Sequence, residues 1–524
     1  MATLPPSRLV LSPREQEYLR VFLRHHLSDA PNRNDDTTRQ GHLQNHSKSD
    51  SSDSDSFNAA AFRSASRVFI TTSLSLKLVG TVLDRVTARS QAKLTHPQPR
   101  KPLVVSQTRL ALSLSTLLFL HRVLFRLFSK LRVQLLHEKV RDIERRYPRV
   151  YAALTSKLAP AIGASLSGLA LGIFPSDQLR LTIAIYIASR ALEIGYTVLD
   201  AAGYMKRNPF GSWVLFALAQ GQLLHAYVFD RDCFPQAYGS FIIQNTPEYI
   251  QRRPENLSPK VRWPSYNQIS DALAEMARLR WPAFVSPILR PKVANTLPAS
   301  IDPIISPITS RAHPALQHLS CALIHPQETS CFIAYLRQIL LSFPKIAKFF
   351  TIYYSAMSLL KIRAFVKMPL QELDRLVKKI LKTSAAITGA IGTSWGTICL
   401  FQWILPRAFL PQFRFFLGGL MGGSFQLLDP GSIGHGNSMY AARTSVDSLL
   451  KVGEKRRWWR PVRGGDVYLF VAALALINVC FDVGRDSVGK DRSMLVIRVL
   501  RGDIELGLQR GRKQEADSEK SHDE

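Results

Sequence analysis

The chain has 524 residues, and 68 basic residues against 39 acidic ones give it a formal net charge of +29. Five cysteines in a chain of this length exclude a disulfide-stapled secreted scaffold. Nucleic-acid binding would need a concentrated basic face on a soluble module, whereas the basic residues here adjoin long uncharged runs. That placement predicts contact with anionic lipid head groups and no nucleic-acid partner.

Residues 1–56 are predicted to form a disordered N-terminal arm, because the stretch 30–57 is rich in Ser, Asp and Asn and lacks aromatic residues until Phe57. Neither terminus carries a recognisable targeting address. We therefore expect targeting to depend on a basic segment beside an apolar helix inside the chain.

Residues 57–250 are predicted to form a first membrane region. A helix that crosses a bilayer needs about 20 apolar residues. Residues 158–176 and 208–229 form uncharged runs of 19 and 22 residues. The stretches 64–83 and 103–120 contain basic residues and are ambiguous between spanning and interfacial helices. Residues 251–317 are rich in Pro and are predicted to be a linker with one helix near 268–280.

Residues 318–490 are predicted to form a second membrane region, followed by a polar tail at 491–524. Its uncharged runs cover 383–406 (24 residues), 415–428 (14) and 467–481 (15). Over the whole chain, three runs reach or approach the spanning length: 158–176, 208–229 and 383–406. They favour a polytopic membrane protein over a soluble protein with buried helices. The region 339–360 contains Lys345 and Lys348 and is ambiguous.

The second region opens with a Cys/His motif. Cys321, His325, Pro326 and Cys331 follow the pattern C-x3-H-P-x4-C. Three soft ligands suit zinc, but no fourth ligand is evident from the sequence. We therefore predict an ordered loop, with no metal and no cofactor. Catalytic constellations are scarce: the chain contains no phosphate-binding loop, zinc-protease motif or serine-nucleophile elbow.

The two membrane regions resemble each other. Anchors recur at nearly equal spacing: a glycine, an arginine, a second glycine five residues before a phenylalanine, and a closing Phe-Asp. They are Gly168, Arg190, Gly211 and Phe216 in the first copy and Gly422, Arg443, Gly465 and Phe470 in the second. The order of the matches favours an internal duplication over the glycine content that membrane hairpins share.

Each anchor arginine has an acid on the same expected helix face. Glu193 lies three residues after Arg190, and Asp447 lies four residues after Arg443. The alternatives are solvated surface pairs, worth a few tenths of a kcal/mol, and half-buried pairs whose loss costs on the order of a few kcal/mol. The sequence leaves both open.

The Cys/His-Pro motif, followed by the Gly-rich helix, the Tyr440–Arg443 segment and the Gly465–Phe470 helix, resembles the transmembrane protein 135 family. The likeness covers roughly residues 57–250 and 318–490. It implies a multi-pass membrane protein of peroxisomes or mitochondria, with hairpins like those of the mitochondrial translocase-channel superfamily.

From the pattern and the resemblance together we expect an all-α bundle of two internal repeats with disordered tails. The expected role is non-enzymatic: organelle membrane organisation, division or lipid handling, with organelle-division proteins as partners and homo-oligomerisation allowed. The alternative is a transporter or translocase-like channel of the same membranes.

Overall fold

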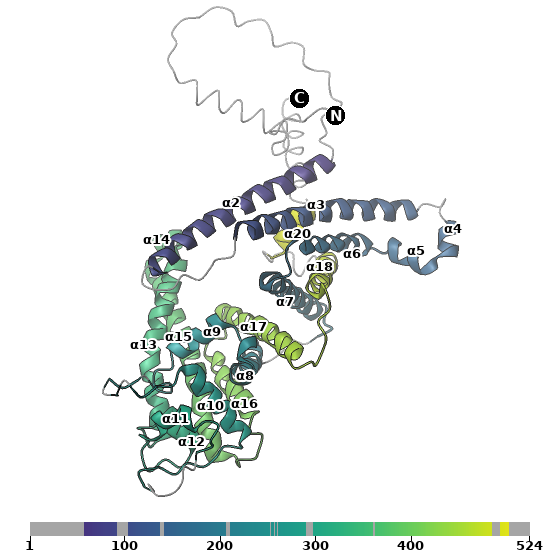
Figure 1. Ribbon diagram of the computed structural model, residues 1–524. Coiled ribbons are helices and arrows are strands. Elements are labelled where there is room, and N and C mark those ends of the chain that lie inside the picture. The colour runs from purple at the N-terminus through teal and green to yellow at the C-terminus, as the bar shows by residue number, and fades with distance from the viewer. Residues whose placement is uncertain are drawn as a thin grey trace, which may run out of the picture. The chain divides into compact units, whose positions relative to one another are not determined.

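The fold is all-α, as the sequence predicts (Figure 1). The computed structural model describes residues 57–91, 103–136, 141–205, 210–251, 253–255, 257–258, 260–289, 297–359, 362–484 and 493–501. Within these ranges the one β-type pairing is an isolated antiparallel bridge between Ala283 and His318. The predicted disordered arm at 1–56 lies outside the described residues, as does the tail apart from residues 493–501.

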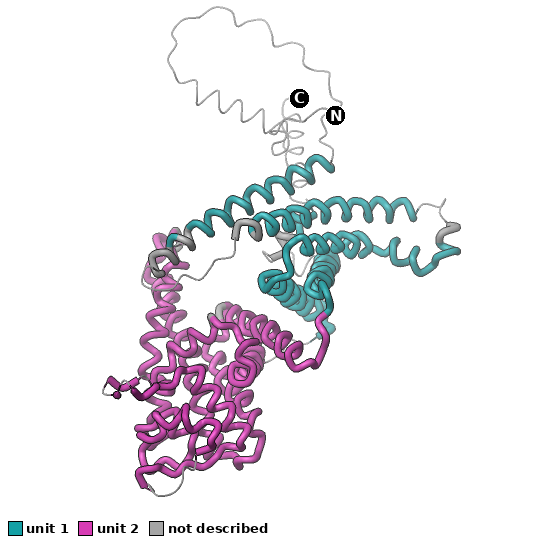
Figure 2. The backbone as a smooth tube through the Cα atoms, viewed as in Figure 1, with its two compact units in different colours: residues 1–206, 462–524 teal, residues 207–461 magenta. Residues whose placement is uncertain are grey.

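The chain divides into two compact units (Figure 2). Unit 1 contains residues 1–206 and 462–524, and unit 2 contains residues 207–461. These limits differ from the predicted regions 57–250 and 318–490. The difference arises because two apolar helices, at 213–229 and 465–483, each pack with the other half of the sequence.

Unit 1 is built on a pair of long helices, α2 and α3, which pack against each other. Its second layer packs α18 against α7, α6 and the 3-10 helix η3. Leu117, Leu171, Ile194, Phe470 and Leu474 form part of its core. The elements are α2 (Phe57–Gln91), α3 (Leu103–Leu135), α4 (Arg141–Arg146), α5 (Pro148–Thr155), α6 (Ala159–Ser165), η3 (Leu166–Ile173), α7 (Gln178–Ala201), α18 (Gly465–Val483) and α20 (Ser493–Arg501).

Unit 2 centres on α8, which packs against α16 and α17, while α15 packs against α13 and α16. Glycines on α16 allow the close approach: a Cβ on Gly419 would clash with the carbonyl oxygen of Gln220 on α8. The elements are α8 (Trp213–Phe229), η4 (Arg231–Cys233), α9 (Gln236–Gln244), α10 (Tyr266–Arg278), α11 (Asp302–Thr309), α12 (Leu319–Ile324), α13 (Cys331–Leu359), α14 (Ile362–Lys367), α15 (Pro369–Ile404), α16 (Arg414–Gly423), η5 (Ser424–Leu428) and α17 (Ser432–Lys455).

The expected Pro-rich linker at 251–317 is folded over most of its described length. The predicted helix is present as α10, and α11 follows it. Ile269, Leu273 and Met276 on α10 are buried in the largest hydrophobic core of unit 2. Their i, i+4, i+7 spacing gives the helix one apolar face, and burying that face places the segment inside the unit instead of between two halves.

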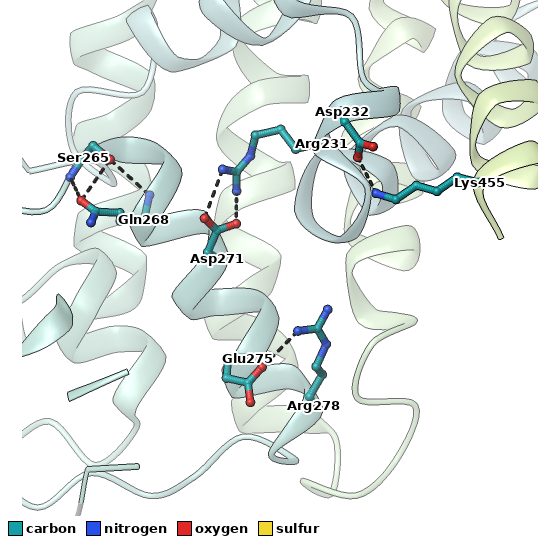
Figure 3. Close-up of polar contacts among 8 residues, drawn as sticks. All are labelled: Arg231, Asp232, Ser265, Gln268, Asp271, Glu275, Arg278 and Lys455. Carbon is teal, nitrogen blue, oxygen red and sulfur yellow. Dashed lines mark hydrogen bonds and ion pairs between the residues drawn. The ribbon is translucent and has the colours of Figure 1, made fainter. Parts of the chain in front are cut away.

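Polar contacts hold the N-terminal half of α10 (Figure 3). Ser265 caps α10: the Gln268 N–H donates to its hydroxyl, and the Ser265 N–H donates back to the Gln268 side chain at 2.9 Å. Arg231 of η4 forms a two-bond ion pair with Asp271 of α10. The segment is therefore held by capping and charge as well as by its apolar face.

Among the residues that the structure describes, four helices are long and apolar enough to cross a membrane. They comprise residues 107–135 of α3 and the whole of α7, α15 and α18. Two of them contain predicted runs, 383–406 in α15 and 467–481 in α18, and α3 contains the ambiguous stretch 103–120. The fourth, α7, includes Arg180, Arg190 and Glu193 and was not among the predicted runs.

Three other uncharged runs do not form long helices. Residues 158–176 divide into α6 and η3, and α5 meets the α6–η3 segment at a bend of 89°. Residues 415–428 form α16 and η5, and residues 208–229 yield the 17-residue α8. Gly211, whose φ is +72°, lies just before α8. Lack of charge therefore overestimates helix length where Pro and Gly interrupt the run.

Candidate metal centre and buried polar clusters

The Cys/His motif lies where α12 ends. Cys321 is on α12. At the end of this helix, the His325 N–H donates to the Cys321 carbonyl at 2.9 Å. His325 and Pro326 then begin a short turn. The Pro326 carbonyl accepts a hydrogen bond of 2.7 Å from the His313 N–H, and the His325 ring Nδ1 lies 2.9 Å from the Glu328 carbonyl oxygen. The loop expected from the sequence is therefore ordered.

Two later segments of the chain lie next to this turn. Cys331 is the first residue of α13, and its Sγ lies 3.8 Å from Cys321 Sγ. Cys399 is on the last turns of α15, 74 residues beyond His325, and its Sγ lies 3.3 Å from His325 Nε2. One ligand atom from each of these four residues lies within 4.8 Å of all the others. We call this set, Cys321, His325, Cys331 and Cys399, the Cys3His cluster.

The Cys3His cluster is enclosed by protein. Cys321, His325 and Cys399 are buried, and Cys331 is partly exposed. All four sulfur-bearing and imidazole groups lie in unit 2, and every cysteine is a free thiol. Within the described residues it is the one group of His, Cys, Asp and Glu side chains placed to share a metal ion.

The groups of the Cys3His cluster shift one another's pKa values. Burial disfavours a charged His325, but hydrogen bonds and attraction to Cys321 and Cys331 outweigh burial and raise the pKa of His325 to about 10. Hydrogen bonds from the Cys321 and Cys399 thiols hold the pKa of the Cys331 thiol well below its usual range. The sequence reasoning missed Cys399, because a single cysteine inside an apolar run carries no sign of its spatial neighbours.

Two of the repeat anchors, Gly168 and Gly422, lie at helix contacts. A Cβ on Gly168 of η3 would lie 3.1 Å from the Phe470 ring of α18 in unit 1. In unit 2 a Cβ on Gly423, next to the anchor Gly422, would lie 3.2 Å from the Phe216 carbonyl oxygen of α8. Gly422 itself faces Ser394 and Ala390 of α15.

In the second pair of glycine anchors, Gly211 and Gly465, the residue with a positive φ differs by one position between the two copies. Gly211 precedes α8 with a φ of +72°, whereas before α18 the positive φ of +72° belongs to Gly464 and not to the anchor Gly465. Glycine is favoured at both positions because other residues are strained there.

The two anchor arginines, Arg190 and Arg443, differ in their position along the helix. Arg190 donates to Glu193 at 2.8 Å, with side chains 31% and 18% exposed, so this pair is half-buried. Asp447 accepts a hydrogen bond of 2.8 Å from Lys451, four residues further along α17. Arg190 is the thirteenth residue of α7, and Arg443 is the twelfth residue of α17. Counted from the start of each helix, the two positions differ by one residue, which corresponds to a rotation of about 100° around the helix axis.

A more buried ion pair was not predicted. Arg180, in the first turn of α7, binds Asp466 in the first turn of α18 through two hydrogen bonds, and its Nη1 donates to the Phe174 carbonyl at 3.0 Å. The two side chains are 9% and 13% exposed. They are 286 residues apart in the sequence, so no local pattern relates them.

A buried polar cluster also lies in unit 1. Asn478 of α18 donates to Ser165 at 2.8 Å and lies 3.2 Å from His121 of α3. Arg501 of α20 donates to the Asn478 carbonyl at 3.2 Å and forms an ion pair with Asp482. The Arg501 guanidinium also lies 4.7 Å from the ring centres of two phenylalanines, Phe125 and Phe481.

Unit 2 contains a cavity of about 70 Å³ between α8, α9 and α15. Its lining is mainly aromatic and aliphatic, with Gln220, Tyr238 and Ser394 among its polar side chains. None of the lining residues is charged. The cavity therefore suits an apolar group or trapped water and has no charged residue to select an ion.

Comparison with known proteins gives no relative: no family model, no curated protein and no solved structure matches the chain. The physical features of the structure alone therefore define the class of protein: a helical chain whose described part contains four candidate membrane spans.

Proposed function

We propose that this chain is a non-enzymatic, multi-pass membrane protein of peroxisomes or mitochondria that organises its membrane through lipids and protein partners. The observation that carries the membrane assignment is the set of four long apolar helices with large uncovered apolar side chains. Leu192 on α7, Trp403 on α15 and Tyr468 on α18 are all more than 60% exposed. Lipid would cover such side chains without cost.

The charge distribution supports contact with anionic head groups. α3 carries Arg126, Lys130 and Arg132 near its C-terminal end, and α15 begins with a charged segment that includes Lys378, Lys379 and Lys382. Each basic residue near an anionic membrane surface contributes roughly 1 kcal/mol to binding. The organelle assignment rests on the family resemblance of the sequence.

We further propose that the chain arose by duplication and that the two copies exchange their third helices. Each copy has a short helix with a 3-10 extension, then a 24-residue helix, then an apolar helix. α7 and α17 begin and end 254 residues apart, and α8 and α18 also end 254 residues apart. Gly168 of the first copy contacts Phe470 of the second, and Gly423 of the second contacts the Phe216 backbone of the first.

The alternative function is a transporter or translocase-like channel. The ion pair of buried Arg501 with partly exposed Asp482 on α18, next to Asn478, favours it, because charges at membrane helices often mark transport pathways. Against it, these charged groups bond to each other, and the lining of the unit 2 cavity carries no charge. The geometry therefore gives more support to the organising role.

Localisation of the tagged full-length chain tests the proposed function. We expect it to coincide with a peroxisomal or mitochondrial membrane marker, and its removal to alter the number or shape of that organelle. As a control, deletion of residues 1–56 should leave the destination unchanged, because the proposed targeting is internal. Localisation elsewhere, or unchanged organelles after removal, contradicts the proposal.

A further inference from the structure

The Cys3His cluster has the composition of a structural zinc site. Structural zinc is held by four cysteine or histidine ligands in a tetrahedron, and Cys3His is one of its common sets. Cys321, His325 and Cys331 are close in sequence, and Cys399 completes the set from a separate helix. Thiolate and imidazole ligands select zinc over the hard cations magnesium and calcium.

The distances match a tetrahedral ion. Two thiolates that each lie 2.3 Å from zinc are about 3.8 Å apart, and a thiolate and an imidazole nitrogen are about 3.6 Å apart. The structure has 3.8 Å between the Cys321 and Cys331 sulfurs and 3.3 Å between His325 Nε2 and the Cys399 sulfur. Because all four ligand atoms lie within 4.8 Å of one another, the space suits one ion instead of a multinuclear cluster.

The surroundings of His325 select the ligating nitrogen. Its Nδ1 lies 2.9 Å from the Glu328 carbonyl oxygen, which accepts only an N–H. Nδ1 therefore carries a proton, and Nε2, which lies beside the Cys399 sulfur, is the nitrogen that can bind a metal. A backbone carbonyl that fixes the tautomer in this way is the usual outer partner of a metal-bound histidine.

We propose that Cys321, His325, Cys331 and Cys399 bind one structural Zn²⁺ ion, which joins the end of α12 and the start of α13 to the last turns of α15. On binding, the sulfurs and Nε2 of His325 release to solvent the protons that they carry, and the three thiolates and the neutral imidazole each donate one electron pair to the ion. This inference goes beyond the proposed membrane role, because it concerns how unit 2 is held together.

Metal analysis of the purified full-length chain in detergent tests the proposal. We expect about one zinc per chain, and a loss of affinity of more than about 100-fold in Cys321→Ser, Cys331→Ser and Cys399→Ser. The chain supplies matched controls: Cys233→Ser and Cys480→Ser replace the two cysteines outside the cluster and should retain zinc. His325→Ala should lose the ion, whereas His325→Cys keeps four ligands and should retain it.

A second measurement does not depend on the variants folding. Replacing zinc by Co²⁺ in the wild-type chain should give the strong thiolate-to-cobalt absorption and the visible bands of a tetrahedral site. Wild-type protein without metal, metal that persists in Cys399→Ser, or a Cys321–Cys331 disulfide in a non-reducing peptide map would each overturn the proposal. Copper in place of zinc would overturn it as well.

Discussion

Two arginines on α7 differ in burial and are expected to differ in their contribution to stability. Removing one partner of a buried ion pair leaves an unpaired charge and costs about 3–5 kcal/mol, whereas an exposed pair contributes about 0–1 kcal/mol. The Arg180–Asp466 pair is buried at the first turns of α7 and α18, and the Arg190–Glu193 pair is half-buried.

We therefore predict that Arg180→Ala lowers the free energy of unfolding by about 3–5 kcal/mol and that Arg190→Ala, at a half-buried pair, lowers it by an intermediate amount of about 1–3 kcal/mol. Thermal unfolding of the two variants in the same detergent compares them on one helix. Equal losses for both would show that Arg180 is not the more important partner.

Glycine on α16 is expected to be required where backbones meet. A Cβ on Gly419 would clash with the Gln220 carbonyl oxygen and would lie 2.8 Å from Gly221 Cα, so backbone would have to move. Gly436 on α17 has no atom within 4 Å of an added Cβ. Gly419→Ala should destabilise the chain by about 1–3 kcal/mol, whereas Gly436→Ala should not.

Abundance and melting temperature in detergent measure both variants. If Gly419→Ala melts with the wild-type chain, the α8–α16 contact is looser than the structure shows.

At the residue scale, part of the site was predictable and part was not. C-x3-H-P-x4-C drew attention to Cys321, His325 and Cys331 as an ordered loop, but the sequence offered no fourth ligand. Cys399 joins them through packing of α12 and α13 against α15, which is a tertiary contact. Arg180 and Asp466 were missed for the same reason, whereas the local pair of Arg190 and Glu193 was predicted from its i, i+3 spacing.

At the scale of elements, uncharged runs predicted α15 and α18 but failed where the backbone breaks. Pro160 and Gly168 lie in the run 158–176, which divides into α6 and η3. The apolar face of α10 was readable as Ile269, Leu273 and Met276, yet the surrounding prolines favoured a linker. A linker prediction from composition fails when a short amphipathic helix can bury its face against a larger core.

The proposed helix exchange predicts which engineered cysteines form disulfides. The variant G168C/F470C should cross-link on mild oxidation, because Gly168 of η3 contacts Phe470 of α18. The unexchanged arrangement would instead cross-link G168C/F216C, the pair from one copy.

Cleavage and peptide mapping identify the cross-linked pair, and G168C alone controls for links to native cysteines. Cross-linking of G168C/F216C without G168C/F470C contradicts the exchange.

At the scale of the whole molecule, the account depends on membrane integration. α15 extends for 36 residues, and its apolar part from residue 383 to 404 spans about 33 Å, close to the thickness of the hydrocarbon layer. Trp403 and Leu400 on this part of α15 are exposed, and a bilayer would remove these apolar side chains from water.

Alkaline carbonate extraction of membranes from cells that express the full-length chain tests this claim most directly. Peripheral proteins held by charge are released at high pH, whereas helices shielded by lipid are retained. We predict that the chain stays in the pellet with an integral membrane marker while a peripheral marker is released. Recovery of most of the full-length chain in the supernatant would contradict the account.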